Sequence, residues 1–105
     1  MAPDETEQLE TVSEVARRVI VSFDVRRRRR TECTLVTHFV FGRRERVRTP
    51  QGTRVYRYPG LIARPGVERL GQSVLLMRED DAEDFTGFLS RLHVPHSAET
   101  VWIKA

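Results

Sequence analysis

The amino-acid sequence predicts a single α+β domain, with a mostly antiparallel sheet and two helices on one face of it. A chain of 105 residues has about the size at which one hydrophobic core forms, and its 39% hydrophobic and 31% charged residues are typical of a folded globular protein. Short β-branched segments alternate with two segments of helical periodicity, and turns containing Pro and Gly separate them. These observations predict the fold class.

The first segment, residues 1–16, carries five acidic residues, no basic residue and no apolar periodicity. We expect a flexible acidic tail there and one folded domain over residues 17–105. Val19 to Val25 is β-branched and mostly apolar, which predicts a buried strand.

The next segment, Thr31 to Phe41, fits two periods. Leu35, Val36 and Val40 are spaced as on a helix, but the apolar residues also alternate as in a strand. Gly42 follows at a natural C-cap position, so we favour the helix.

A polar hairpin is predicted after this helix. Arg46 to Arg48 and Thr53 to Tyr58 flank the turn residues Thr49 to Gly52. Two Pro-Gly pairs, at 59–60 and 65–66, then predict two changes of direction before Gln72 to Met77 forms another core strand.

The clearest helix follows Asp80, which with Glu83 has capping-box spacing. Its predicted buried stripe is Ala82, Phe85, Phe88, Leu89 and Leu92. Val101 to Ile103 is predicted to be a short terminal strand, in which Trp102 either lies in the core, the commoner place for such a residue, or serves as a second stacking platform. The resulting order of strands and helices predicts a ferredoxin-like core with an added β-hairpin, and leaves one sheet face for a partner.

Charge is segregated along the chain. Residues 17–57 carry thirteen arginines and three acidic residues, whereas the flanking segments are acidic. Arginine presents a planar fork of donors that matches phosphate geometry. The middle of the chain is therefore the candidate anion-binding part.

Two arginine clusters and two tyrosines form the candidate site. The run of five arginines after the first strand is costly unless water or an anion neutralises it. The hairpin adds a second cluster, and together the two are predicted to form one continuous phosphate track. Tyrosines beside arginines can stack on bases, although tyrosines also commonly cover a core edge. The predicted nucleic-acid-binding residues are Arg26, Arg27, Arg28, Arg29, Arg30, Arg43, Arg44, Arg46, Arg48, Arg54, Tyr56, Arg57 and Tyr58.

Other chemistry has weaker signals. The single cysteine, Cys33, forms no internal disulfide, and His93 and His96 have metal-like spacing but no third ligand nearby. We expect no metal or other cofactor. The acidic start and the lack of a long apolar run predict a cytoplasmic protein without a membrane span.

A faint family pattern is also present. The first strand ends in Phe23-Asp24 and arginines follow it; a predicted helix then closes on Gly42, and Gln72 to Val74 opens a strand before an acidic helix. This arrangement resembles the small CRISPR spacer-acquisition protein with a ferredoxin-like fold. The resemblance implies a homodimer that holds DNA along a basic face, and a metal-dependent nuclease if Asp24 matches the family's aspartate. The tail and the inserted residues 43–70 depart from that family's layout.

The sequence thus predicts a non-catalytic accessory protein that binds DNA or RNA through phosphates, largely without regard to base sequence. One alternative is a subunit of a larger nucleic-acid enzyme, such as a replicative polymerase, which the Leu61-Ile62 loop or the tail would contact. Small basic accessory proteins of archaeal replication, chromatin or ribosomes share this size and charge. The other alternative is the nuclease that uses Asp24.

Overall fold

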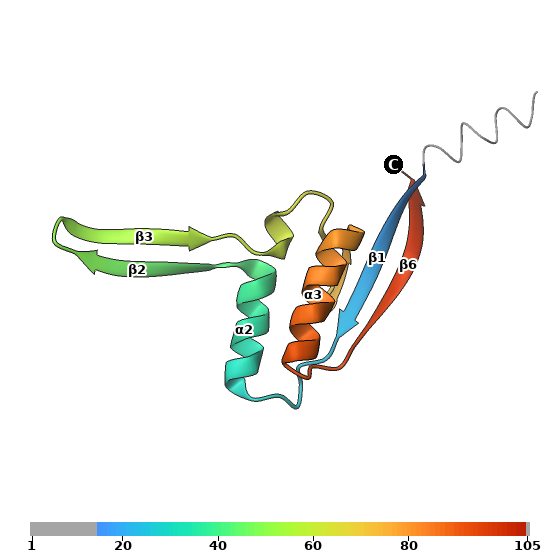
Figure 1. Cartoon of the computed structure of the whole chain (residues 1–105), viewed down its shortest axis with the longest axis horizontal. Coiled ribbons are helices and arrows are strands. Elements are labelled where there is room, and N and C mark those ends of the chain that lie inside the picture. The colour runs from blue at the N-terminus through green and yellow to red at the C-terminus, as the bar shows by residue number, and fades with distance from the viewer. Residues whose placement is uncertain (1–14, 105) are drawn as a thin grey trace, which may run out of the picture.

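A four-stranded antiparallel sheet forms the base of the fold (Figure 1). In the computed structural model, which describes residues 15–104, its strands are β1 (Val15–Phe23), β4 (Glu68–Gly71), β5 (Val74–Met77) and β6 (His96–Lys104). They lie in the order β4-β5-β1-β6. The predicted acidic tail lies outside the described residues as far as residue 14, and Val15 and Ala16 already belong to β1.

Two helices complete the core. The first, α2 (Arg30–Phe41), confirms the helical interpretation of its segment, and Gly42 caps it with φ 80°. The second, α3 (Glu79–Arg91), begins two residues earlier than predicted, with Arg78 rather than Asp80 at its N-cap. The predicted capping box at Asp80 and Glu83 is therefore wrong, because both residues lie inside the helix. Acidic side chains in its first turn instead complement the helix dipole.

Both helices and the sheet share one hydrophobic core. Phe85 lies at its centre, with its ring 5.3 Å from that of Phe23 and 5.6 Å from that of Phe39. The stripe predicted for α3 is confirmed at Ala82, Phe85 and Leu89, which are buried. Other buried members of this core are Val19, Val21, Val36, Val40, Leu61, Leu75, Met77 and Val94.

The predicted α+β class is confirmed, with one strand more than expected. β4 has only four residues, with a bulge between Arg69 and Gly71, and it pairs with β5 in a tight hairpin. Without the hairpin described next, the elements run strand, helix, strand, strand, helix, strand. That is the order which the predicted ferredoxin-like core requires. No helix in residues 15–104 has the length and apolar character to cross a membrane.

A two-stranded hairpin follows α2 in the chain and projects from the body on the side away from the four-stranded sheet (Figure 1). We name it the ribbon; it consists of β2 (Arg43–Thr49) and β3 (Gly52–Tyr58), paired antiparallel along their whole length. Seven residues extend about 23 Å at roughly 3.3 Å each. The hairpin prediction is confirmed.

Two glycines join the ribbon to the end of α2. A Cβ atom on Gly42 would lie 2.3 Å from the carbonyl oxygen of Tyr58, and a Cβ atom on Gly60 would lie 2.3 Å from the Gly42 nitrogen. The incoming and outgoing chains therefore cross in backbone contact. Only glycine allows this approach, so the two chains stay in contact at the base of the ribbon only while both residues are glycine.

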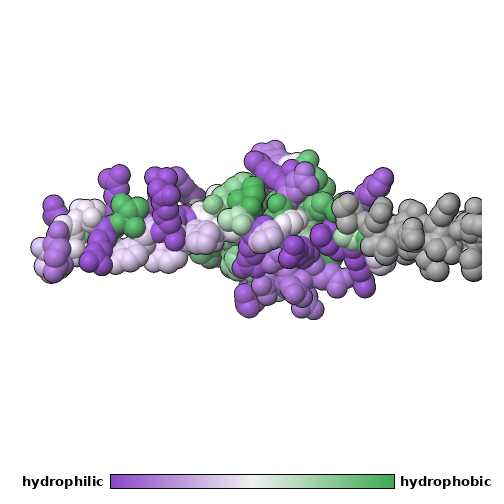
Figure 2. Space-filling model, turned by 90° about the horizontal axis from the view of Figure 1, so that it is seen from above, coloured by the Kyte–Doolittle hydropathy of each residue, from purple (hydrophilic) through white to green (hydrophobic). Residues whose placement is uncertain are grey.

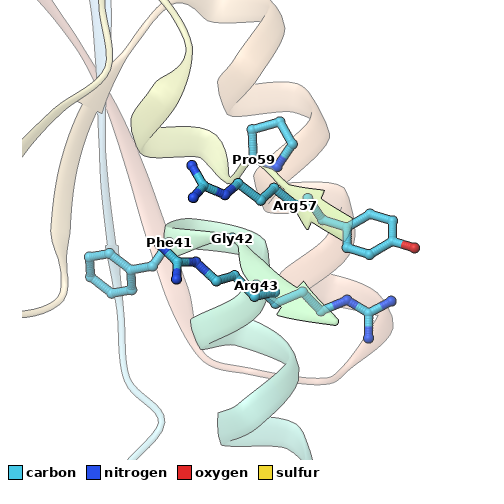
Figure 3. Close-up of a pocket in the computed structure, with 7 residues that line it drawn as sticks. Phe41, Gly42, Arg43, Arg57 and Pro59 are labelled. Atoms are coloured by element: carbon cyan, nitrogen blue, oxygen red, sulfur yellow. The ribbon is translucent and has the colours of Figure 1, made fainter. Parts of the chain in front are cut away.

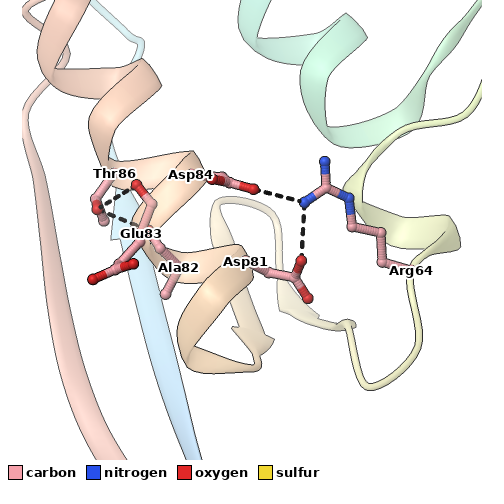
Figure 4. A network of polar contacts seen from close by, with 6 residues as sticks. All are labelled: Arg64, Asp81, Ala82, Glu83, Asp84 and Thr86. Carbon is pink, nitrogen blue, oxygen red and sulfur yellow. Dashed lines mark hydrogen bonds and ion pairs between the residues drawn. The ribbon is translucent and has the colours of Figure 1, made fainter.

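The chain beyond the ribbon is tied to α3. After the short 3-10 helix Leu61–Ala63, Arg64 donates hydrogen bonds to Asp81 at 2.9 Å and to Asp84 at 3.2 Å (Figure 4). The bond with Asp81 raises the pKa of Arg64 above its ordinary value. Leu61 itself is 1% exposed. The predicted partner-binding loop is thus wrong at Leu61, which belongs to the core.

Candidate nucleic-acid interface

The two faces of the ribbon carry different side chains. Residues opposite each other in an antiparallel pair project to the same face, and successive residues alternate. The register therefore assigns four arginines and no acidic residue to one face, which we name the arginine face: Arg44, Arg46, Arg48 and Arg57. The other, the tyrosine face, carries Arg43, Glu45, Val47, Arg54, Tyr56 and Tyr58.

The ribbon is exposed on both faces. Every residue of β3 is exposed, as are all four arginines of β2. In Figure 2 the ribbon is the narrow arm from which hydrophilic side chains project, while hydrophobic surface gathers over the body. Within residues 15–104, none of the arginine-face side chains forms an ion pair.

Two of these arginines face each other directly at the base of the ribbon. Arg44 is paired with Arg57 across the strands. Like charges in directly opposite positions destabilise a hairpin, and an isolated two-stranded hairpin is marginal even without them. A bound anion would remove this repulsion.

A shallow pocket of about 360 Å³ lies beside this arginine pair (Figure 3). Its lining includes Phe41, Arg44, Arg57 and Pro59. The Phe41 ring is 45% exposed, and the Arg69 guanidinium lies 5.1 Å from its centroid. The pocket lining therefore combines aromatic rings with three arginines, since Arg43 also belongs to it; Arg69 reaches the Phe41 ring but does not line the pocket. Sequence reasoning missed Phe41 and Arg69, because Phe41 was interpreted only as the end of a helix.

The tyrosine face is less basic. The Arg43 guanidinium lies 4.7 Å from the ring centroid of Tyr58 and 3.9 Å from a Glu45 carboxylate oxygen. Tyr56 and Tyr58 are 42% and 44% exposed. Both tyrosines were predicted to lie on one face of the strand and Arg57 on the other face, and the register confirms this. Their rings are accessible for stacking.

The run of five arginines lies at the N-terminus of α2. Arg26 is committed to Asp24 through two side-chain hydrogen bonds of 3.0 and 2.9 Å, and its backbone N–H donates a third at 2.9 Å. These bonds hold the pKa of Asp24 at about 2, below its usual 3.8. Arg29 is the N-cap residue of α2, and Arg30 is its first residue. Cations at the positive end of a helix dipole are unfavourable, and an anion there is favourable.

The two arginine clusters do not form the predicted continuous track. α2 has twelve residues and separates them, which corresponds to about 18 Å. Within the ribbon, Arg43 and Arg54 project to the face opposite the other four arginines. The site therefore consists of the arginine face and a separate group at Arg27, Arg28, Arg29 and Arg30.

The remaining candidates have other surroundings. Both carboxylate oxygens of Asp24 accept hydrogen bonds from Arg26. His96 Nδ1 lies 2.8 Å from the carbonyl oxygen of Val94. Residues 15–104 hold no cluster of three metal-ligating side chains. Trp102 is 67% exposed, so its predicted place in the core is wrong.

Comparison of the chain with protein-family models, with curated proteins and with solved structures finds no match.

Proposed function

We propose that this protein is a non-catalytic accessory factor that binds nucleic acid by gripping phosphates through the arginine face of the ribbon. The main observation behind this proposal is that one exposed face of the ribbon has four arginines and no acidic residue: Arg44, Arg46, Arg48 and Arg57. Such a surface is costly in isolation, and neutralising phosphates releases condensed counterions. The proposal requires no specific reading of base sequence.

The shape of the ribbon favours duplex DNA. Two strands about 4.8 Å apart form a narrow ribbon, and the major groove of B-form DNA, about 12 Å wide, admits a two-stranded ribbon. The major groove of an A-form RNA duplex is deep and narrow and does not admit one. The close backbone contact of Gly42 and Gly60 sets the point at which the ribbon leaves the body.

The arginines at the start of α2 provide a second contact. Arg27, Arg28 and Arg30 form no ion pair within the described part of the chain. They lie about 18 Å from the ribbon along α2, so they would contact phosphates outside the groove that the ribbon occupies. Arg26 contributes little, because Asp24 already neutralises it.

The test is a salt titration of binding. Fluorescence anisotropy would measure the affinity for a labelled DNA duplex, the matching single strand and the matching RNA duplex between 50 and 200 mM salt. The logarithm of affinity should fall linearly with the logarithm of salt concentration. Replacing all four arginine-face residues with serine should reduce the slope on duplex DNA by up to about 3.6.

A second variant separates the two clusters. Serine at Arg27, Arg28 and Arg30 should reduce the slope by up to about 2.7 and leave the preference for duplex DNA over duplex RNA unchanged. Circular dichroism would verify that both variants fold. Salt-independent binding, or an unchanged slope after the four ribbon replacements, would overturn the proposal.

A further inference from the structure

The two edges of the sheet differ in how they are protected. β4 is four residues long and bulged, which blunts that edge against pairing with another chain. β6 is nine residues long, pairs regularly with β1 on one side and contains no proline; its one lysine is the last residue, Lys104. On its other side, no strand among the described residues pairs with it. Within residues 15–104, β6 is therefore an unpaired edge.

The single tryptophan of the chain stands on this edge. Trp102 lies opposite Arg17 of β1. Arg17, Val19 and Val21 alternate onto the same face of β1, and Val19 and Val21 are buried beneath the helices. Trp102 thus projects on the helix side of the sheet, where 67% of it is exposed.

A hollow of about 290 Å³ lies on the same side of the same strand. Ala98 and Thr100 of β6 form one wall, and Ala82, Glu83 and Thr86 of α3 form another. Ala98 lies opposite the fully buried Val21, so its small side chain leaves room next to the helix.

We propose that β6 pairs antiparallel with β6 of a second copy of this chain. Full overlap of nine residues centres the pair on Thr100, so that Trp102 of each copy stands opposite Ala98 of the other. Directly opposite residues have Cβ atoms about 5 Å apart on one face. Each tryptophan then enters the hollow of the other copy, and the interface is self-complementary, as a twofold dimer requires.

The charges along β6 fit the same register. Glu99 stands opposite Val101, and Lys104 stands opposite His96. Glu99, the one acidic residue of β6, therefore meets an apolar side chain and no like charge directly across the pair. The second copy is the favoured occupant because the projecting ring and the hollow that receives it lie four residues apart on one strand.

The dimer leaves the ribbon accessible. Figure 1 shows the ribbon and β6 on opposite sides of the body. The inference does not depend on nucleic-acid binding, because it rests on β6, Trp102 and the hollow alone. If both hold, each dimer presents two ribbons, and binding becomes bivalent.

Sedimentation velocity over a range of concentrations tests the dimer, with Trp102 emission as a local probe. The full chain should have twice its 12.2 kDa mass, and dilution should shift the emission to longer wavelength as the mass falls. Ala98→Arg should give a monomer with long-wavelength emission and unchanged circular dichroism. Trp102→Ala should weaken the dimer, and Leu70→Ala at the opposite edge, where Leu70 is 50% exposed, should leave it intact.

Three outcomes would overturn the proposal. One is a wild-type chain that is monomeric at every concentration with long-wavelength emission. Another is an Ala98→Arg variant that still dimerises. The third is a monomer with short-wavelength emission that shifts only when residues 1–14 are deleted, which would show that the chain's own N-terminal segment covers the edge.

Discussion

Two pairs of arginines allow the faces of the ribbon to be compared at equal charge. Arg46 and Arg48 project to the arginine face, whereas Arg43 and Arg54 project to the tyrosine face. Serine at either pair removes two positive charges from the same hairpin. If the arginine face contacts the phosphates, replacing Arg46 and Arg48 should reduce the magnitude of the salt slope on duplex DNA by about 1.8. Replacing Arg43 and Arg54 should reduce it by well under one unit.

The slope converts into a measurable ratio. A rise in salt from 50 to 200 mM is a fourfold change in concentration. A slope difference of about 1.8 therefore changes the ratio of the two affinities about twelvefold over this range. The affinity advantage of the wild type over the Arg46/Arg48 variant should therefore shrink about twelvefold across this range. For the Arg43/Arg54 variant the advantage should stay nearly constant. Anisotropy titrations on one duplex would measure both, and equal slope changes would show that total charge, rather than the face, governs binding.

Three further predictions concern the core, the α2 N-terminus and the tyrosine face. Phe85→Ala should destabilise the fold by about 3 to 5 kcal/mol in denaturant unfolding, whereas Glu83→Ala should cost under about 1 kcal/mol; equal losses would mean that the burial of α3 is misassigned. The Asp24 carboxyl, with its pKa at about 2, adds stability that is present above about pH 4 and is lost as the pH falls through 2. Arg26→Ala should raise that pKa part of the way toward its usual 3.8 in an NMR titration, because the backbone N–H of residue 26 still donates to the carboxyl; no change would exclude the side-chain pairing as a cause. Tyr56→Ala should cost about 1 to 3 kcal/mol on single-stranded DNA with little change in salt slope, and a loss confined to duplex would contradict base stacking.

The fold class and most elements could be predicted from the sequence, because periodicity and turn residues act locally. Gly42 resolved the ambiguous segment correctly, since glycine readily adopts the positive φ with which this helix ends. β4 was missed because four residues containing a bulge carry no periodic signal. Trp102 was assigned to the core wrongly because an apolar strand at a sheet edge has the same sequence pattern as a buried strand.

The candidate site was predictable in its residues but not in its arrangement. Composition identifies the arginines, and alternation within a strand separates Arg57 from the tyrosines. The distance between the two clusters depends on α2 being a helix, which the sequence favoured only narrowly. The ion pair between Arg26 and Asp24 and the exposure of Phe41 depend on the three-dimensional arrangement of the chain, which the local sequence pattern does not specify.

The glycine crossing also constrains how the length of the ribbon can change in evolution. Because Gly42 and Gly60 fix the base, added residues must extend the ribbon outward, toward its turn. Side chains alternate between faces with a period of two, so one residue added to each strand would move every side chain beyond the insertion to the opposite face. Lengthening by two residues per strand preserves the division between arginines and tyrosines. Viable descendants of this hairpin should therefore differ in length by even steps along each strand.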